Sequence, residues 1–136
     1  MDDVVLNKAA TIERCVQRVR DEHQGDPKNL TGNVTRQDSI ILNLQRACEA
    51  AINLSMHLVR LRRLGIPQES REGFELLARA GIIPAEMTAT LKRMVGFRNV
   101  AVHDYRKLDL AIVESIVEKR LDELLEFARV AVVAFG

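Results

Sequence analysis

Apolar residues recur at alternating spacings of three and four along most of the chain, and short stretches rich in Gly, Pro and Asn interrupt them. This spacing places the apolar side chains on one face of an α-helix. The pattern predicts one short helix, over residues 69–80, and four long ones. The long helices are expected over residues 2–24, residues 35–64, from Pro84 into residues 97–105, and over residues 109–135.

The longest regular stripe identifies the central helix, which is expected to begin near Thr35 and to stop at Gly65-Ile66-Pro67. Asp109 is expected to cap the last helix, and residues 25–34 to form a polar loop. Short connections favour antiparallel neighbours. Residues 1–136 are therefore predicted to form a single all-α domain, an antiparallel bundle of four long helices and one short helix. The stripe of the central helix consists of Ile40, Leu44, Ala47, Ala51, Leu54, Leu58 and Leu61.

The composition also favours packed helices. Of the 136 residues, 47 % are apolar but only 4 % are aromatic, so aliphatic side chains and Met must fill the core. Cys15 and Cys48 fall within apolar stripes and lack metal-binding spacing, which is typical of buried thiols in a reducing compartment. No apolar stretch approaches the about 18 residues of a membrane span, and no signal peptide is evident. A cytoplasmic location without membrane contact is expected.

One position breaks the apolar stripe of the helix that begins near Pro84. Met87, Leu91 and Met94 follow the helical spacing, but the next position is Arg98. A buried and unpaired guanidinium is strongly unfavourable. Arg98 is therefore expected either to pair inside the protein or to line a cleft that is open to solvent and ligand.

Further polar side chains follow Arg98 closely. If the helix continues, Arg98 and Tyr105 lie on nearly the same face, and Asn99 and His103 share the adjoining face. A fixed cation, an amide, an imidazole that titrates near neutrality and a phenol would then converge. The structural alternative is an ion-paired Arg98, with a His103 that caps the last carbonyls of its own helix.

The same segment carries a family resemblance. Arg98, four intervening residues and then His103-Asp104-Tyr105 resemble the R-x4-6-H-x-Y signature of the HEPN superfamily, and the preceding run Gly96-Phe97-Arg98-Asn99 is similar to that of the HepT-like toxins. The resemblance implies a metal-independent endoribonuclease without a cofactor. In this interpretation Arg98 stabilises the phosphate, His103 is the general acid or base, and Asn99 and Asp104 orient them.

The resemblance also implies partners. HepT-like toxins are encoded beside a minimal nucleotidyltransferase antitoxin, which silences the toxin by transferring AMP to the motif tyrosine, here Tyr105. Such a phosphate is expected to pair with Arg98 beside His103. The alternative for Tyr105 is structural, with a buried ring and a hydrogen-bonded hydroxyl.

A symmetric homodimer is expected, as is usual in this family, with Arg98 and His103 near the interface. One cation and one imidazole per protomer are a sparse apparatus for phosphoryl transfer, and two copies would supply separate acid and base roles. The apolar end of the chain, Ala131 to Phe135, would also suit an interface.

A polar seam lies beside the central stripe, because Glu49, Asn53 and His57 are spaced by four residues. It is either a solvated helix edge, or Glu49 and Asn53 support the cleft of Arg98 and His103 by pairing with the cation. A metal site is not expected, because the three histidines of the chain lie in different segments and lack metal-binding spacing.

Charge is distributed unevenly, although the net charge is only +1. Residues 85–108 carry five basic against two acidic side chains, as do residues 36–63, whereas residues 109–130 carry three against six. The central and motif helices are expected to form a basic side that can contact phosphates; the alternative is ordinary solvated faces. The candidate cations are Arg60, Arg62, Arg63, Lys92, Arg93, Arg106 and Lys107.

Three functions fit these features. The first is RNA cleavage, in which the 2′-OH of the substrate attacks the phosphate while a histidine and a cation assist. The second is a non-catalytic interaction module whose motif is a polar lock between helices. The third is a nucleotide-binding module that holds a phosphate without catalysis and acts with a nucleotidyltransferase partner. We adopt RNA cleavage, because the motif and the predicted architecture agree.

Overall fold

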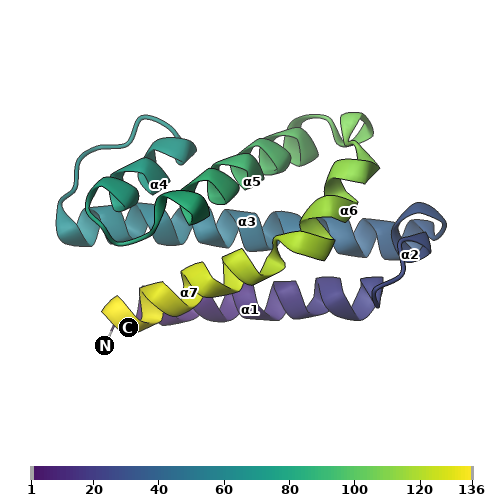
Figure 1. Cartoon of the computed structure of the whole chain (residues 1–136), viewed down its shortest axis with the longest axis horizontal. Coiled ribbons are helices and arrows are strands. Elements are labelled where there is room, and N and C mark those ends of the chain that lie inside the picture. Colours follow the sequence, from purple (N-terminus) through teal and green to yellow (C-terminus); the bar gives the residue numbers. More distant parts are fainter. Residues whose placement is uncertain (1, 136) are drawn as a thin grey trace.

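The computed structural model describes residues 2–135, which form helices, turns and loops without a β-strand. Four long helices run in alternating directions, so the predicted all-α antiparallel bundle is confirmed (Figure 1). These are α1 (Asp3–His23), α3 (Val34–Arg62), α5 (Ala85–His103) and α7 (Leu121–Phe135). Shorter elements connect them: α2 (Lys28–Thr31), α4 (Ser70–Arg79), the 3-10 turn η1 (Tyr105–Lys107) and α6 (Leu110–Lys119). None of the helices within residues 2–135 has the length and apolarity needed to cross a membrane.

Helix α3 lies at the centre of the bundle and packs against α1, α4, α5 and α7. The predicted stripe from Ile40 to Leu58 is buried, whereas Leu61, near the end of the helix, is exposed. The rings of Phe74 in α4 and Phe127 in α7 pack edge to face in the core, with their centroids 5.5 Å apart. A few aromatic rings thus complete a core that is otherwise aliphatic, as the composition predicts.

Both cysteines are buried and free, as predicted. Burial raises the pKa of the Cys48 thiol to about 12, although the nearby Arg98 guanidinium acts in the opposite direction. Cys48 is therefore a neutral packing residue of α3 at physiological pH.

The helix starts follow capping chemistry, with one shift from the prediction. Helix α3 begins at Val34, next to Thr35 where its start was expected, and Asn33 caps it: the Asn33 side-chain oxygen accepts a hydrogen bond from the Arg36 amide at 3.0 Å. The expected loop before it contains the short helix α2. Asp109 caps α6 as predicted, because it accepts from the Ala111 amide at 2.9 Å.

The single helix predicted over residues 109–135 is wrong. The chain turns at Arg120, so that α6 packs against α2 whereas α7 packs along α1 and α3 (Figure 1). Val117 and Leu121 are both buried on either side of the turn. No Gly or Pro marks the break, and two different packing partners explain it.

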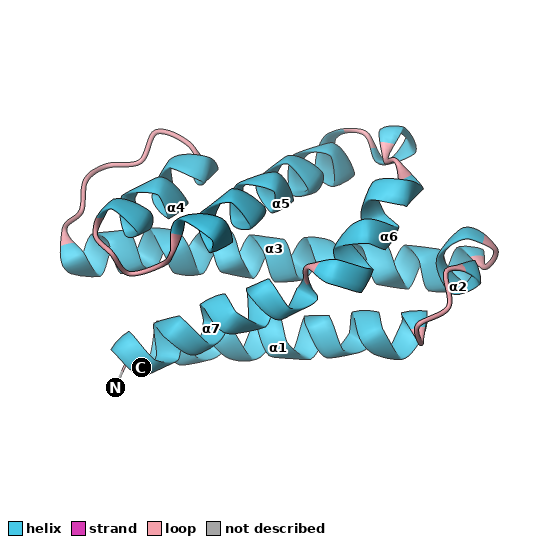
Figure 2. Ribbon diagram, viewed as in Figure 1, coloured by secondary structure: helices cyan, strands magenta, loops and turns pink. Residues whose placement is uncertain are grey.

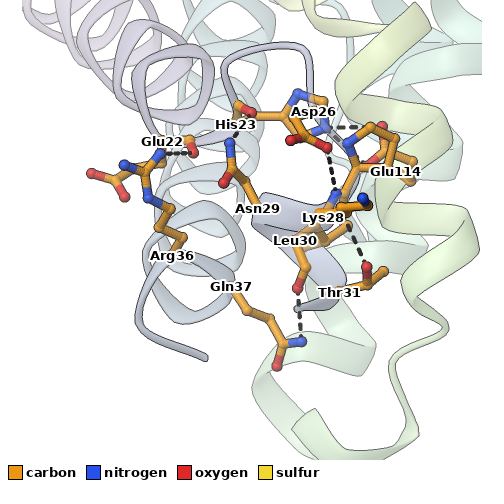
Figure 3. Close-up of polar contacts among 11 residues, drawn as sticks. Glu22, His23, Asp26, Lys28, Asn29, Leu30, Thr31, Arg36, Gln37 and Glu114 are labelled. Carbon is orange, nitrogen blue, oxygen red and sulfur yellow. Dashed lines mark hydrogen bonds and ion pairs between the residues drawn. The ribbon is translucent and has the colours of Figure 1, made fainter. Parts of the chain in front are cut away.

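A buried histidine ties α6 to the rest of the bundle (Figure 3). The Nε2 atom of His23 lies 2.9 Å from both carboxylate oxygens of Glu114. The Asn29 amide donates to the His23 carbonyl at 2.8 Å, and the Gln37 amide donates to the Leu30 carbonyl at 3.0 Å. Side chains and carbonyls of α1, α2, α3 and α6 are thereby joined at one end of the molecule.

The loops differ in length, and the longest, residues 63–69, connects α3 to α4 (Figure 2). It brings α4 back over the C-terminal half of α3 and beside α5. At this crossing α4 and α3 approach so closely that a Cβ atom added to Gly73 would lie 2.6 Å from the Ser55 hydroxyl. Ser70, at the start of α4, is thereby positioned near Arg98 of α5.

Candidate active site

The motif helix ends inside the motif. Helix α5 stops at His103, the Asp104 amide makes the last helical bond to the Val100 carbonyl at 2.8 Å, and Tyr105 begins the turn η1. The expectation that Arg98 and Tyr105 share one helical face is therefore wrong. The backbone leaves the α region at Asp104, with φ −155° and ψ 82°, and turns the tyrosine toward α3.

Arg98 lines a cavity, which is the second of the two alternatives expected for it. Its Nη2 atom donates to the Ser70 hydroxyl at 3.2 Å, and its buried Nε atom has no hydrogen-bond partner. Within residues 2–135, no carboxylate forms an ion pair with this guanidinium. The cavity has a volume of about 280 Å³ and is lined by Arg98, Glu49, Ile52 and Asn53. The cation thus keeps donors that are available to an anionic ligand.

Glu49 and Asn53 lie beside Arg98, where the prediction puts them, but no hydrogen bond or ion pair joins them to it in the described part of the chain. The Glu49 carboxylate instead accepts a long bond, 3.4 Å, from the Gln45 amide. His57, the third residue of the seam, binds Asp2 through Nε2 at 2.9 Å. The seam therefore divides into a part that lines the cavity and a part that ties down the start of α1.

His103 points to a different side of α5 from Arg98. Five residues of helix correspond to a rotation of about 140° between them. His103 is exposed, and no side-chain hydrogen bond involving it or Asn99 is present within residues 2–135. Asn99 and Asp104 are half-buried, and Asp104 lies 3.8 Å from the Lys107 ammonium. One copy of the chain therefore does not bring the cation and the imidazole together.

Tyr105 contacts the first turns of α3. Its hydroxyl donates to the Asp38 carboxylate at 2.7 Å, and 42 % of the residue is exposed. Partial burial and the Asp38 carboxylate raise the pKa of Tyr105 to about 12. The structural alternative is therefore half right, since the hydroxyl is bonded but the ring is not enclosed.

The expected basic side is divided. Arg60, Arg62 and Arg63 lie at the end of α3 farthest from the end of α5 (Figure 1). The Arg62 guanidinium stacks 4.5 Å from the centre of the Phe135 ring. Lys92 pairs with Glu75 at 2.6 Å. Arg62 and Lys92 thus take part in packing and ion pairing, and Arg60, Arg62 and Arg63 do not form one patch with the motif.

Sequence reasoning missed a basic cleft between α1 and α3. It has a volume of about 520 Å³, and the cations that line it are Lys8, Arg14, Arg18 and Arg46. In the sequence, the three cations of α1 lie beside its apolar stripe, but the acidic residues of the same segment obscure this pattern. Within residues 2–135, no group of three or more His, Cys, Asp or Glu side chains could hold a metal ion.

Comparison with known proteins identifies the class of this fold and site. Residues 12–131 match the family described as Ribonuclease HepT-like. The chain is 46 % identical over 127 residues to the mRNA nuclease HepT of Shewanella oneidensis, covering 93 % of this chain and 95 % of that protein. The chain therefore belongs to the HepT-like ribonucleases of the HEPN superfamily, which confirms the resemblance and the prediction of a ribonuclease.

Solved structures support the same assignment. One is a tri-AMPylated Shewanella oneidensis HEPN toxin in complex with MNT antitoxin, with a TM-score of 0.91 and 45 % identity over 98 % of this chain and 99 % of that one. Another is a toxin–antitoxin structure with AMP-PNP, with a TM-score of 0.91 and 44 % identity over 97 % of this chain and 99 % of that one. In the first of these structures, the toxin is AMPylated and is bound to the MNT antitoxin.

Proposed function

We propose that this protein is the toxin of a toxin–antitoxin pair and cleaves RNA endonucleolytically without a metal ion. Arg98 binds the scissile phosphate and stabilises the negative charge that develops on it, and His103 acts as general acid or base. Asn99 and Asp104 orient these groups from adjacent positions of the chain. Glu49 and Asn53 support Arg98 from the wall of its cavity.

The reaction follows from the chemistry of RNA. The ribose 2′-oxygen attacks the adjacent phosphorus, a 2′,3′-cyclic phosphate forms, and the bond from phosphorus to the 5′-oxygen breaks. A base removes the 2′-proton and an acid protonates the leaving oxygen, and an imidazole can serve either step near neutral pH. The guanidinium donates hydrogen bonds to the phosphate oxygens, which carry more charge in the transition state than in the ground state.

The observation that carries this proposal is the unpaired charge of Arg98. The Arg98 guanidinium borders a cavity open to solvent, and no carboxylate of the described residues forms an ion pair with it. Its Nη2 atom is hydrogen-bonded to Ser70, whereas its buried Nε atom has no partner. A structural arginine in a helical bundle would be expected to be ion-paired, because the unpaired charge is costly. A phosphate that enters this cavity would provide the missing partner.

A homodimer supplies what one copy lacks. Arg98 and His103 lie on different sides of α5, so a twofold axis near the end of α5 would let groups of two copies share one cleft. Exposed apolar side chains surround this end, namely Val100, Val102 and Ile112. Light scattering at micromolar concentration is expected to give the mass of a dimer. A monomeric mass with intact ribonuclease activity would contradict the dimer.

The antitoxin is proposed to be a minimal nucleotidyltransferase that transfers AMP from ATP to Tyr105. The tyrosine oxygen bonds to the α-phosphorus, the bond from that phosphorus to pyrophosphate breaks, and the hydroxyl proton passes to Asp38, its hydrogen-bond acceptor. Within one copy, the phosphate on Tyr105 would lie away from Arg98, so the expected pairing of the two would involve the Arg98 of the other copy. Asp38 and Glu49 are 11 residues apart on α3, or about 16 Å along the helix. AMP on Tyr105 would instead lie near His103, two residues away. Its phosphate would add negative charge at the entrance of the shared cleft.

Tyr105 is the only tyrosine of the chain, so its modification is simple to assign. Incubation with the cognate nucleotidyltransferase and ATP is expected to add the mass of AMP to the intact protein and to abolish RNA cleavage. Tyr105→Phe is expected to remain unmodified and active. Equal AMP addition to wild type and Tyr105→Phe would contradict the assignment.

The ribonuclease proposal is tested by His103→Ala. Because His103 is exposed, the variant is expected to fold with an unchanged thermal midpoint and to lose RNA cleavage by about 10²-fold or more. His57→Ala is the matched control, because it removes a histidine that binds Asp2, away from the site, and it should cleave RNA normally. Cleavage by His103→Ala at the rate of the control would refute the role of His103.

A further inference from the structure

The cleft between α1 and α3 gathers uncompensated positive charge. Lys8, Arg14 and Arg18 line it from α1 and Arg46 lines it from α3, whereas Glu49 is the one acidic residue of its lining. None of the four cations forms an ion pair within residues 2–135. Three of them are exposed and Lys8 is half-buried. Like charges that converge on one concave surface repel each other and attract an anion.

A buried amide marks the floor of the same cleft. Asn43 is only 3 % exposed, and its Nδ2 atom donates to the carbonyl and the hydroxyl of Ser39 at 2.8 and 3.3 Å. Its Oδ1 atom has no donor. Buried acceptors are rarely left unsatisfied in folded proteins. An unsatisfied polar atom therefore lies directly beneath the basic cleft.

The cleft adjoins the cavity of Arg98. Glu49 and Asn53 line both spaces, so the two meet across the surface of α3. From Lys8 to Arg18 the cleft follows ten residues of α1, about 15 Å. This is an elongated track that begins beside the proposed phosphate site. A second copy of the chain is a poor occupant, because its own cleft would bring four more cations against these four.

We infer that the cleft between α1 and α3 binds the sugar-phosphate backbone of the RNA strand that continues from the phosphate at Arg98. This inference rests on the proposed function and names where that substrate lies. The cations contact the phosphates of the strand. The contacts involve the backbone and few bases, since the lining contains no aromatic side chain on which a base could stack.

The test is direct binding of an RNA that cannot be cut. A fluorescent 2′-O-methyl RNA oligonucleotide lacks the nucleophile, so its anisotropy reports binding alone. Arg14→Gln/Arg18→Gln removes two cations of the cleft. The matched control, Arg79→Gln/Lys119→Gln, removes two exposed cations of α4 and α6 and changes the net charge equally. Thermal unfolding establishes that all three proteins are folded.

The cleft variant is expected to weaken binding by about tenfold and to lower the slope of log affinity against log salt by about 0.7 for each lost phosphate contact. The control is expected to bind nearly as the wild type. Equal affinities and slopes for the two double variants would overturn the inference. A change of oligomeric mass in the cleft variant alone would also overturn it, because the cleft would then be a protein interface.

The outcome for the cleft is separable from that for the ribonuclease activity. If the wild type binds the uncut RNA with the expected difference between variants but cleaves no RNA, the proposed catalysis fails and the binding site stands. If the wild type cleaves RNA and the cleft variant binds like the control, the catalysis stands and the inference fails.

Discussion

The hydrogen bond between Tyr105 and Asp38 makes a quantitative prediction about the tyrosine. A tyrosinate oxygen 2.7 Å from the Asp38 carboxylate would be repelled by it. Because the tyrosine is 42 % exposed, a water-like dielectric is appropriate. Coulomb's law then gives about 1.5 kcal/mol, which corresponds to about one pKa unit. Asp38→Asn is therefore expected to lower the pKa of Tyr105 from about 12 by about one unit.

The chain suits this measurement, because it contains one tyrosine and no tryptophan. The rise in ultraviolet absorbance on formation of tyrosinate reports Tyr105 alone. Asp122→Asn is the matched control, since Asp122 is exposed and pairs with Arg20 on another side of the bundle. A titration of Asp38→Asn that superimposes on those of the wild type and the control would refute the reasoning.

The raised pKa of Tyr105 also makes the free energy of unfolding depend on pH. The pKa of Tyr105 in the folded protein, about 12, is above its ordinary value of 10.0, so the folded state holds the proton more tightly. The stabilisation is fully present below pH 10.0 and is lost as the pH rises toward about 12. Urea unfolding across this range is expected to show a smaller loss for Asp38→Asn than for the wild type. An equal or larger loss in the variant would contradict the sign.

Packing gives further predictions. Gly73→Ala is expected to destabilise the protein by roughly 1–3 kcal/mol in urea unfolding, because the new Cβ would lie 2.6 Å from the Ser55 hydroxyl; Ser55→Ala, which removes a buried hydroxyl without a partner, should partly restore the loss. His23→Ala leaves the Glu114 carboxylate without its buried partner and should cost about 1–3 kcal/mol in the same assay. Phe127→Ala should cost about 3–5 kcal/mol, because the fully buried ring leaves a cavity beside Phe74. Unchanged unfolding midpoints would contradict the packing argument at each position.

The long helices could be predicted from sequence because their signal is local. Apolar spacing, capping residues and breakers lie within a few residues of each boundary, as at Asp109 and Gly65. The turn at Arg120 could not be predicted, because the residues around it favour a continuous helix and different packing partners separate α6 from α7. Local propensity determines where helices form, whereas tertiary packing determines where this one divides.

The candidate site was predictable to a similar degree. Arg98 stands out because it occupies a core position of an amphipathic stripe, and the structure gives that position a cavity. The partner of Tyr105 could not be found, because Asp38 is 67 residues away and lies on another helix. The cations of α1 were missed because the same segment also carries Asp2, Asp3, Glu13, Asp21 and Glu22, so that its net charge is not basic. Only the packing of α1 on α3 shows that Arg14 and Arg18 share one side with Arg46.

The central claim is that the free guanidinium of Arg98 stabilises the phosphate during RNA cleavage. It is tested most directly by single-turnover cleavage at saturating RNA, in the presence of a chelator, with Arg98→Gln. The variant removes the charge, keeps hydrogen-bonding capacity toward Ser70, and should fold like the wild type in thermal unfolding. The account predicts a fall of about 10²-fold or more in the cleavage rate. Cleavage by folded Arg98→Gln at the wild-type rate would contradict it.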